Sequence, residues 1–172
     1  TSRAVALEAG LPKSSHASGV NRLCGSGVQA IISAAQQLIT GDAKLSLAGG
    51  VEVMSQAPYS VEGMRQGRKM GDGRLIDWLT GALTDPMGNG GMGMTAENIA
   101  AKYDISRERQ DEYALQSQER AAAAIANGEF TDQIVPVGDF TSDEHPRQTT
   151  LEKLGGLRPT FKKDGTVTAG NS

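Results

Sequence analysis

Residues 24–41 read Cys-Gly-Ser-Gly-Val-Gln-Ala-Ile-Ile-Ser-Ala-Ala-Gln-Gln-Leu-Ile-Thr-Gly. The apolar side chains recur at helical spacing, and Gly41 stands where a C-terminal cap is expected. The stretch predicts an amphipathic helix with Cys24 at its N-terminal threshold. The following residues, 45–54, read as a buried strand that runs into a glycine-bearing turn. A helix followed by a buried strand is typical of the α/β class.

The residue composition and pattern of the chain change twice around this unit, near residues 54 and 164. A short helix is expected at Ser2–Ala9, since Gly10 and Pro12 follow it. Residues 63–74 carry four basic side chains and four glycines, which predicts an irregular excursion. Further expected elements are a short helix at Met94–Tyr103 capped by Thr95, a long helix at Ser106–Asn127 capped by Ser106, an edge strand at Ile134–Val137 and a return to strand at Asp164–Gly170.

Composition excludes several classes of protein. The chain has 172 residues, with 17 basic against 20 acidic side chains and a net charge of -3, which argues against nucleic-acid binding. No run approaches the roughly 20 apolar residues of a membrane helix, and residues 1–10 lack the anatomy of a signal peptide. We therefore expect no membrane partner and a cytoplasmic location. One cysteine and two histidines make a metal site improbable. The start without Met and the end at Ser172 within an apparent strand lead us to expect a piece of a longer polypeptide.

Cys24 is the strongest candidate for chemistry. A thiol at a helix N-terminus lies near unsatisfied backbone N–H groups and the positive end of the helix dipole, which favours the thiolate. Gly25 and Gly27 allow backbone amides to approach a substrate carbonyl, and the N–H of Cys24 could contribute to an oxyanion hole. Spacing alone leaves open a small buried hydrophobic residue or a redox thiol, although no second cysteine is present to resolve a disulfide.

Four separated segments carry a resemblance that goes further than spacing. They are VNRLCGSGVQA (20–30), GDAKLSLAGGVEVMSQAPY (41–59), GMGMTAENIA (91–100) and TLEKLGGLRPTFKKDGTVTAGNS (150–172). Their order and content resemble the thiolases, the family of acetyl-CoA acetyltransferases and 3-ketoacyl-CoA thiolases. The resemblance implies the layered αβαβα thiolase fold. It assigns 1–53 to part of the N-terminal α/β domain, 54–166 to an inserted, mainly helical loop domain, and 167–172 to a return strand.

The resemblance also implies an activity. Cys24 matches the cysteine that thiolases acylate in a ping-pong transfer between acyl-CoA thioesters, which forms or cleaves 3-ketoacyl-CoA. Acetyl-CoA and coenzyme A are then substrates, and no permanently bound cofactor is implied. Expected contacts to coenzyme A or the acyl group are Met92, Arg147, Lys153, Thr160, Phe161 and Ala169. A homotetramer is also implied, with the basic excursion at 63–74 in assembly rather than phosphate binding.

Two departures from the family pattern keep alternatives open. Gly91 stands where biosynthetic acetoacetyl-CoA thiolases have His, which leaves room for a longer-chain 3-ketoacyl-CoA thiolase of fatty-acid degradation. The Gly-His-Pro motif of the catalytic base and the Cys-x-Gly-Gly-Gly motif of the second cysteine are absent from the 172 residues. The chain alone is therefore expected to be inactive in turnover, and a non-catalytic coenzyme A binding or assembly module is a second alternative. His16 and His145 are expected in solvated loops.

Overall fold

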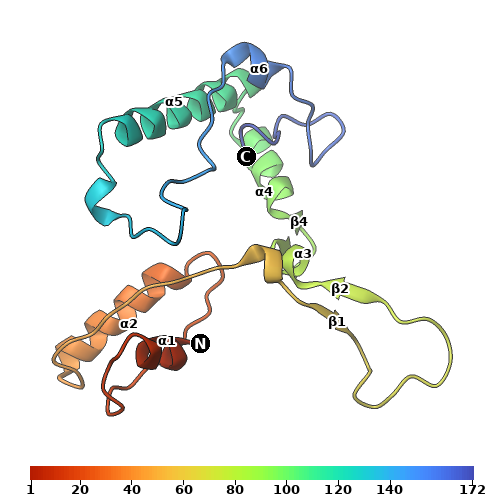
Figure 1. The fold of residues 1–172 in the computed structure, drawn as a ribbon. Helices are drawn as coiled ribbons and strands as arrows, with labels where there is room; N and C mark the ends of the chain where they lie inside the picture. The colour runs from red at the N-terminus through yellow and green to blue at the C-terminus, as the bar shows by residue number, and fades with distance from the viewer. The chain divides into compact units, whose positions relative to one another are not determined.

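The computed structural model describes all residues from Thr1 to Ser172. The chain divides into two compact units, Thr1–Ala82 and Leu83–Ser172, which we describe separately. Their elements are drawn in Figure 1. The predicted domain boundaries at residues 53 and 166 follow from the resemblance alone and stay a prediction.

The first unit contains two helices that the sequence predicts. They are α1 (Ser2–Glu8) and α2 (Ser26–Thr40). Gly41 ends α2 in the left-handed conformation, with φ of 81°, and its N–H donates to the carbonyl of Leu38. Glycine adopts this conformation without steric cost, which is why it ends helices so often.

The remaining elements of the first unit surround a β-hairpin. They are the 3₁₀ turn η1 (Met54–Gln56), the strands β1 (Tyr59–Val61) and β2 (Leu75–Asp77), and the short helix α3 (Trp78–Ala82). The strands pair antiparallel in the register Tyr59–Asp77, Ser60–Ile76 and Val61–Leu75. Residues 62–74 form the irregular loop between them, as predicted, and three of its glycines have positive φ.

The expected strand at residues 45–54 is not formed. Residues 45–53 have no regular secondary structure, and Leu45 and Leu47 are 83% and 80% exposed. A strand is defined by hydrogen bonds to a neighbour, and no segment within the 172 residues pairs with this one. The apolar pattern therefore correctly marks a surface suited to burial, but the prediction of a strand is wrong for this chain.

The second unit contains a short hairpin and three helices. The hairpin is β3 (Thr84–Asp85) with β4 (Gly90–Gly91), and the helices are α4 (Met92–Lys102), α5 (Arg107–Ala126) and α6 (Leu151–Gly155), with the 3₁₀ turn η2 (Thr131–Gln133) after α5. Ser106 caps α5 as predicted, since its hydroxyl accepts from the N–H of Arg109 at 3.3 Å.

Three predictions in this unit are wrong. Helix α4 begins at Met92, so Gly91 occupies the N-cap and Thr95 lies inside the helix. Ile134–Val137 forms no strand beyond an isolated bridge between Val137 and Phe140. Asp164–Gly170 is also not a strand. Strand formation fails in both segments for the same reason as at 45–54, because no neighbouring ladder is available.

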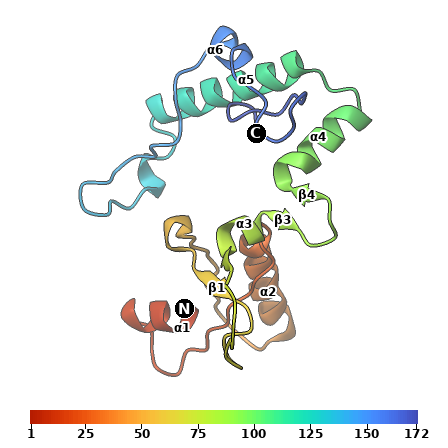
Figure 2. The same cartoon turned by 90° about the vertical axis from the view of Figure 1, so that its right-hand side faces the viewer.

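The buried residues all belong to the second unit. They are three apolar residues, Ala100, Leu154 and Val167, and three polar ones, Glu97, Asp111 and Thr168. Figures 1 and 2 show the C-terminal segment folded back toward α4 and α5, which supply Ala100, Glu97 and Asp111. The core of this unit therefore forms where residues 165–171 meet the two helices.

Candidate functional site

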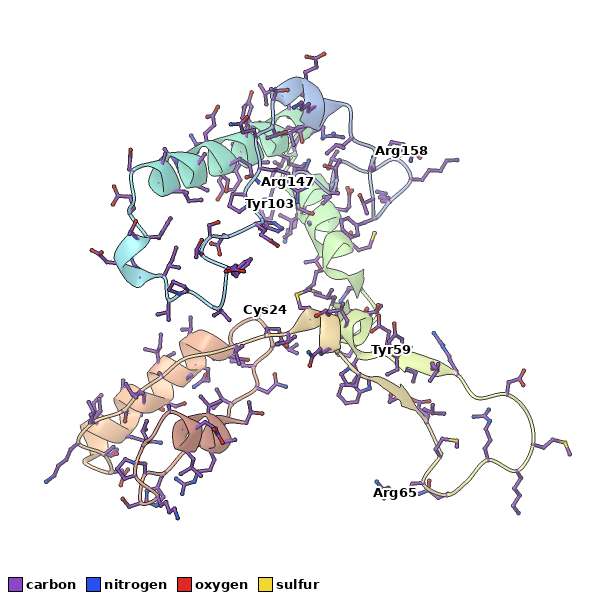
Figure 3. The ribbon with its side chains drawn as sticks, in the orientation of Figure 1. Cys24, Tyr59, Arg65, Tyr103, Arg147 and Arg158 are labelled. Carbon is purple, nitrogen blue, oxygen red and sulfur yellow. The ribbon has the colours of Figure 1, made fainter.

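Cys24 lies in a tight turn that leads directly into α2 (Figure 3). The preceding residue, Leu23, has a φ of 48°, which is uncommon for a residue with a branched side chain. Two neighbours hold this conformation. The N–H of Leu23 donates to Oδ1 of Asn21 at 3.0 Å, and the hydroxyl of Ser26 donates to the carbonyl of Leu23 at 2.6 Å. The backbone next to the thiol is therefore strained, and two hydrogen bonds of Leu23 hold it in this conformation.

Ser26 completes the turn by binding the chain on the other side of Cys24. Its hydroxyl oxygen accepts from the N–H of Arg22 at 2.8 Å. The Arg22 side chain in turn donates to Oε1 of Gln29, one turn into α2, at 2.8 Å. The turn and the first turn of the helix are thus one hydrogen-bonded structure.

The thiol of Cys24 is free and exposed to solvent. In this chain the thiol is therefore accessible to a substrate or a reagent. Helix α2 has no side-chain cap at its N-terminus, and the N–H groups of Gly27 and Val28 have no backbone acceptor. Unpaired N–H groups at a helix start favour negative charge nearby. This arrangement suits a sulfur nucleophile and a carbonyl oxygen that becomes negative during attack.

No other side chain in the first unit joins Cys24 in a catalytic pair. His16 is exposed in a loop, as predicted, and His145 is exposed in a loop of the second unit. No group of three or more His, Cys, Asp or Glu side chains is placed to hold a metal ion. None of the helices combines the length and the apolar character needed to cross a lipid bilayer.

The six residues predicted to contact coenzyme A or the acyl group all lie in the second unit, and four of them are linked there. Met92 begins α4, and the next residue, Gly93, lies under the ring of Phe161, where a Cβ would come within 2.2 Å of a ring carbon. Thr160 donates its N–H to the carbonyl of Val167 at 3.0 Å, two residues before Ala169. The structure thus connects the start of α4 with both parts of the predicted coenzyme A segment.

Arg147 and Lys153 are exposed at other points of this unit. The backbone N–H of Arg147 donates to Oε1 of Gln118 on α5 at 3.0 Å, and Arg147 is exposed to solvent. Lys153 lies on α6, and its N–H donates to the hydroxyl of the cap residue Thr150 at 3.2 Å. No contact joins the two cations to the linked group of four, so their roles stay a prediction.

An open apolar pocket of about 410 Å³ adjoins Met92. The pocket is lined by Met92, Ala96, Ile99, Ala100, Ile105 and Val167, with Thr95, Gln110 and Asn171 as its polar members. Apolar walls beside a residue predicted to line the acyl site are suited to a hydrocarbon chain.

Two carboxylates of this unit, Glu97 and Asp111, are buried, at only 5% and 4% exposed. The Nε of Arg107 lies 2.8 Å from Oδ2 of Asp111, which makes an i,i+4 ion pair on α5 whose carboxylate is buried. Glu97 accepts hydrogen bonds from residues 166 and 167, about 70 positions away. No local pattern could indicate partners at that distance.

Comparison with known proteins gives a consistent family. The chain is 51% identical to the beta-ketothiolase BktB of Cupriavidus necator, 51% identical to the mitochondrial 3-ketoacyl-CoA thiolase of Rattus norvegicus, and 48% identical to an acetyl-CoA acetyltransferase of Chromobacterium violaceum. Each match covers 99% of this chain and 45–46% of the relative, so the chain spans a little less than half the length of these proteins.

Solved structures agree with the sequence relatives. The crystal structure of human mitochondrial 3-ketoacyl-CoA thiolase in complex with CoA matches 99% of this chain with a TM-score of 0.93 at 50% identity. The Bacillus anthracis acetyl-CoA acetyltransferase matches with a TM-score of 0.93 at 46% identity. The predicted fold class is therefore confirmed, and the chain covers 45% of each of these two structures. The profile of the family described as "Thiolase, N-terminal domain" matches residues 1–172, and the chain belongs to the thiolase family.

Proposed function

We propose that this chain is the nucleophile-bearing part of an acyl-CoA C-acyltransferase that forms or cleaves 3-ketoacyl-CoA through an acyl-cysteine. One observation carries the proposal: a chain of the thiolase family places its single cysteine exposed, in a strained turn, at the start of α2. The relatives named as acetyl-CoA acetyltransferase, beta-ketothiolase and 3-ketoacyl-CoA thiolase support this class of activity.

The acyl half-reaction follows from the geometry of the turn. The thiolate of Cys24 attacks the carbonyl carbon of an acyl-CoA thioester, and the carbonyl oxygen becomes negative next to the start of α2. The new carbon–sulfur bond to Cys24 forms as the bond to the coenzyme A sulfur breaks, and coenzyme A leaves as a thiol after taking a proton. One thioester replaces another, so the step is close to thermoneutral and runs in either direction.

The coenzyme A portion of the substrate is proposed to lie on the second unit. Thr160, Phe161 and Ala169 are proposed to face the nucleotide or the pantetheine arm, and Met92 the acyl group. Arg147 and Lys153 supply exposed positive charge suited to phosphate. Coenzyme A enters and leaves as substrate, and we propose no permanently bound cofactor.

The acyl chain length is the point on which the alternatives differ. Acetyl transfer is the first proposal, and a longer-chain thiolase of fatty-acid degradation is the second. Gly91 favours the second because it stands where the biosynthetic acetoacetyl-CoA thiolases that the chain resembles have His. Rates with acetyl, hexanoyl and longer thioesters would separate the two, since only the second predicts that activity rises with chain length.

We also propose that the protein assembles into a tetramer and that it is located in the cytoplasm. The exposed loop at residues 62–74 carries Arg65, Arg68, Lys69 and Arg74 on an irregular backbone, which suits a contact between subunits of a tetramer. A cytoplasmic enzyme is proposed from the composition. Gel filtration of the polypeptide isolated from its source tests the tetramer, and substitution of the four cations by serine should reduce the assembled fraction.

The decisive experiment is the intact mass of the polypeptide, as its source makes it, before and after exposure to acetyl-CoA. We expect a gain of one acetyl group that maps to Cys24 and is absent in Cys24→Ser. A wild-type protein that binds coenzyme A but gains no mass would replace the enzyme proposal with the non-catalytic binding module. A protein that neither gains mass nor binds coenzyme A would contradict both.

A further inference from the structure

Glu97 is the most highly coordinated buried charge in the second unit. It extends from α4 and is 5% exposed. Its Oε1 accepts from the backbone N–H groups of Thr166 at 2.9 Å and of Val167 at 2.8 Å. Its Oε2 accepts from the N–H of Thr166 at 3.0 Å and from the Thr166 hydroxyl at 3.4 Å. One carboxylate thus satisfies two consecutive backbone donors that have no strand partner.

The fit between Glu97 and this segment leaves no spare room. A Cβ on Gly165 would lie 2.1 Å from Oε1 of Glu97 and 2.6 Å from its carboxyl carbon. Since a carbon atom cannot approach so closely, only glycine lets the backbone reach the carboxylate. The glycine and the glutamate therefore form a matched pair, although they lie 68 positions apart in the sequence.

Asp111 fastens the other end of the same segment. Its Oδ1 accepts from Nδ2 of Asn171 at 2.8 Å, while the amide oxygen of Asn171 accepts from the N–H of Thr168 at 2.8 Å. Asn171 also donates to the carbonyl of Thr166 at 3.1 Å. Residues 166–171 are thus held at one end by a carboxylate on α4 and at the other by a carboxylate on α5.

The held segment contains one predicted coenzyme A contact and is hydrogen-bonded to a second. Ala169 lies between the two fastened ends, and Thr160 is tied to the segment because its N–H donates to the carbonyl of Val167. Backbone that is not part of a sheet pays a conformational cost to be ordered when a ligand binds. A carboxylate that orders it beforehand removes that cost from the binding step.

We propose that Glu97 is a positioning residue for coenzyme A: its buried carboxylate fixes residues 165–169 in the conformation that receives the substrate. The proposal rests on the proposed function, because it needs an acyl-CoA as ligand. Glu97 does not touch the reacting carbon and takes no part in the bond changes at Cys24. Its effect is confined to the affinity for the coenzyme A portion of the substrate.

The test compares two acetyl donors on the polypeptide as its source makes it. Acetyl-CoA presents the nucleotide and the whole pantetheine arm, whereas S-acetyl-N-acetylcysteamine keeps the thioester and lacks the nucleotide and most of the arm. In Glu97→Gln, an amide NH₂ group replaces one carboxylate oxygen. It is itself a donor, so it cannot accept from the backbone N–H groups of Thr166 and Val167. We expect the concentration of acetyl-CoA for half-maximal acylation of Cys24 to rise about tenfold, with the maximal rate unchanged. The short thioester should acylate the variant at the wild-type rate.

Controls separate positioning from folding. Glu119→Gln removes an exposed carboxylate of α5 that makes no ion pair and should change nothing. Gly165→Ala leaves Glu97 in place and pushes the segment away from it, so it should repeat the tenfold effect. Calorimetric binding of coenzyme A should weaken in Glu97→Gln and Gly165→Ala alike.

Three results would overturn the proposal. Unchanged affinity for acetyl-CoA in both Glu97→Gln and Gly165→Ala would show that the segment is not positioned by Glu97. An equal loss of acylation by both donors would show a general structural role. Failure of the wild-type protein to be acylated by either donor would refute the proposed function itself, and the positioning role would fall with it.

Discussion

The residue that most constrains the nucleophile is Ser26, whose hydroxyl bridges Arg22 and Leu23 around Cys24. Ser26→Ala removes both hydrogen bonds, each of which contributes about 1 kcal/mol to the free energy of unfolding. Leu23 then loses one of the two contacts that hold its positive φ. We expect the wild-type Cys24 to react with iodoacetamide faster than free cysteine, and Ser26→Ala to slow that reaction. Ser14→Ala, at an exposed serine without a side-chain hydrogen bond, serves as the control. Equal rates in Ser26→Ala and wild type would disprove the role of the turn.

A second prediction concerns Gly93, because the ring of Phe161 occupies the space that a side chain at this position would need. Gly93→Ala forces the ring away from the start of α4. Phe161 is 42% exposed and can move outward, so the cost in unfolding free energy should be small, about 1 kcal/mol. The affinity for coenzyme A should fall more noticeably, as measured by calorimetry. Gly155→Ala, where the new Cβ meets nothing within 4 Å, should leave the affinity unchanged. Unaltered affinity in Gly93→Ala would remove Phe161 from the proposed site.

At the scale of elements, the four longer helices could be predicted, whereas the strands and the two five-residue helices α3 and α6 were not. The spacing of apolar residues indicated α2, and the cap residue Ser106 indicated α5, because both signals are local. Residues 45–54 carry an equally clear apolar pattern, but their state depends on hydrogen-bond partners that no pattern within the segment supplies. The same limit applies to the site. Cys24 was evident from its motif, whereas Glu97 was not, because its partners lie about 70 residues away.

Helix α5 yields a prediction about pH, since its first turn carries Glu108. The backbone N–H of Glu108 itself and then the Ser106 hydroxyl hold the pKa of this carboxyl below its ordinary value. A depressed pKa means that the carboxylate stabilises the folded helix at neutral pH. This contribution is lost as the pH falls below the ordinary pKa of a Glu side chain and through the depressed one. Ser106→Ala should raise the Glu108 midpoint in a carboxyl-carbon NMR titration and reduce stability by about 1 kcal/mol. The Glu108 midpoint should be the same in Glu112→Gln as in the wild type, which would confirm that the effect is specific. A Glu108 midpoint in Ser106→Ala equal to that of the wild type would refute the prediction.

At the scale of the whole chain, the exposed surface exceeds that of a compact folded protein of the same mass. The accessible area is 14483 Å², whereas a folded monomer of 18.0 kDa exposes about 8,000 Å². The excess is strongly apolar in the first unit, where Ile39, Leu45 and Leu47 are each at least 80% exposed. Apolar surface on this scale is normally covered by further protein. We infer that α2 and residues 45–53 form a packing surface that further protein covers.

The two units should therefore differ in stability when the 172-residue chain is prepared alone. Every buried residue lies between Glu97 and Thr168, and the first unit has none. Amide hydrogen exchange measures local opening, and protection follows burial and hydrogen bonding. We expect measurable protection in α4, in the first turns of α5 and at residues 165–168, and rapid exchange throughout α1 and α2. In the polypeptide as its source makes it, α2 should gain protection because its apolar face is covered. Strong protection of α2 in the isolated chain, with a cooperative thermal transition, would show that the first unit needs no cover and would contradict the burial argument.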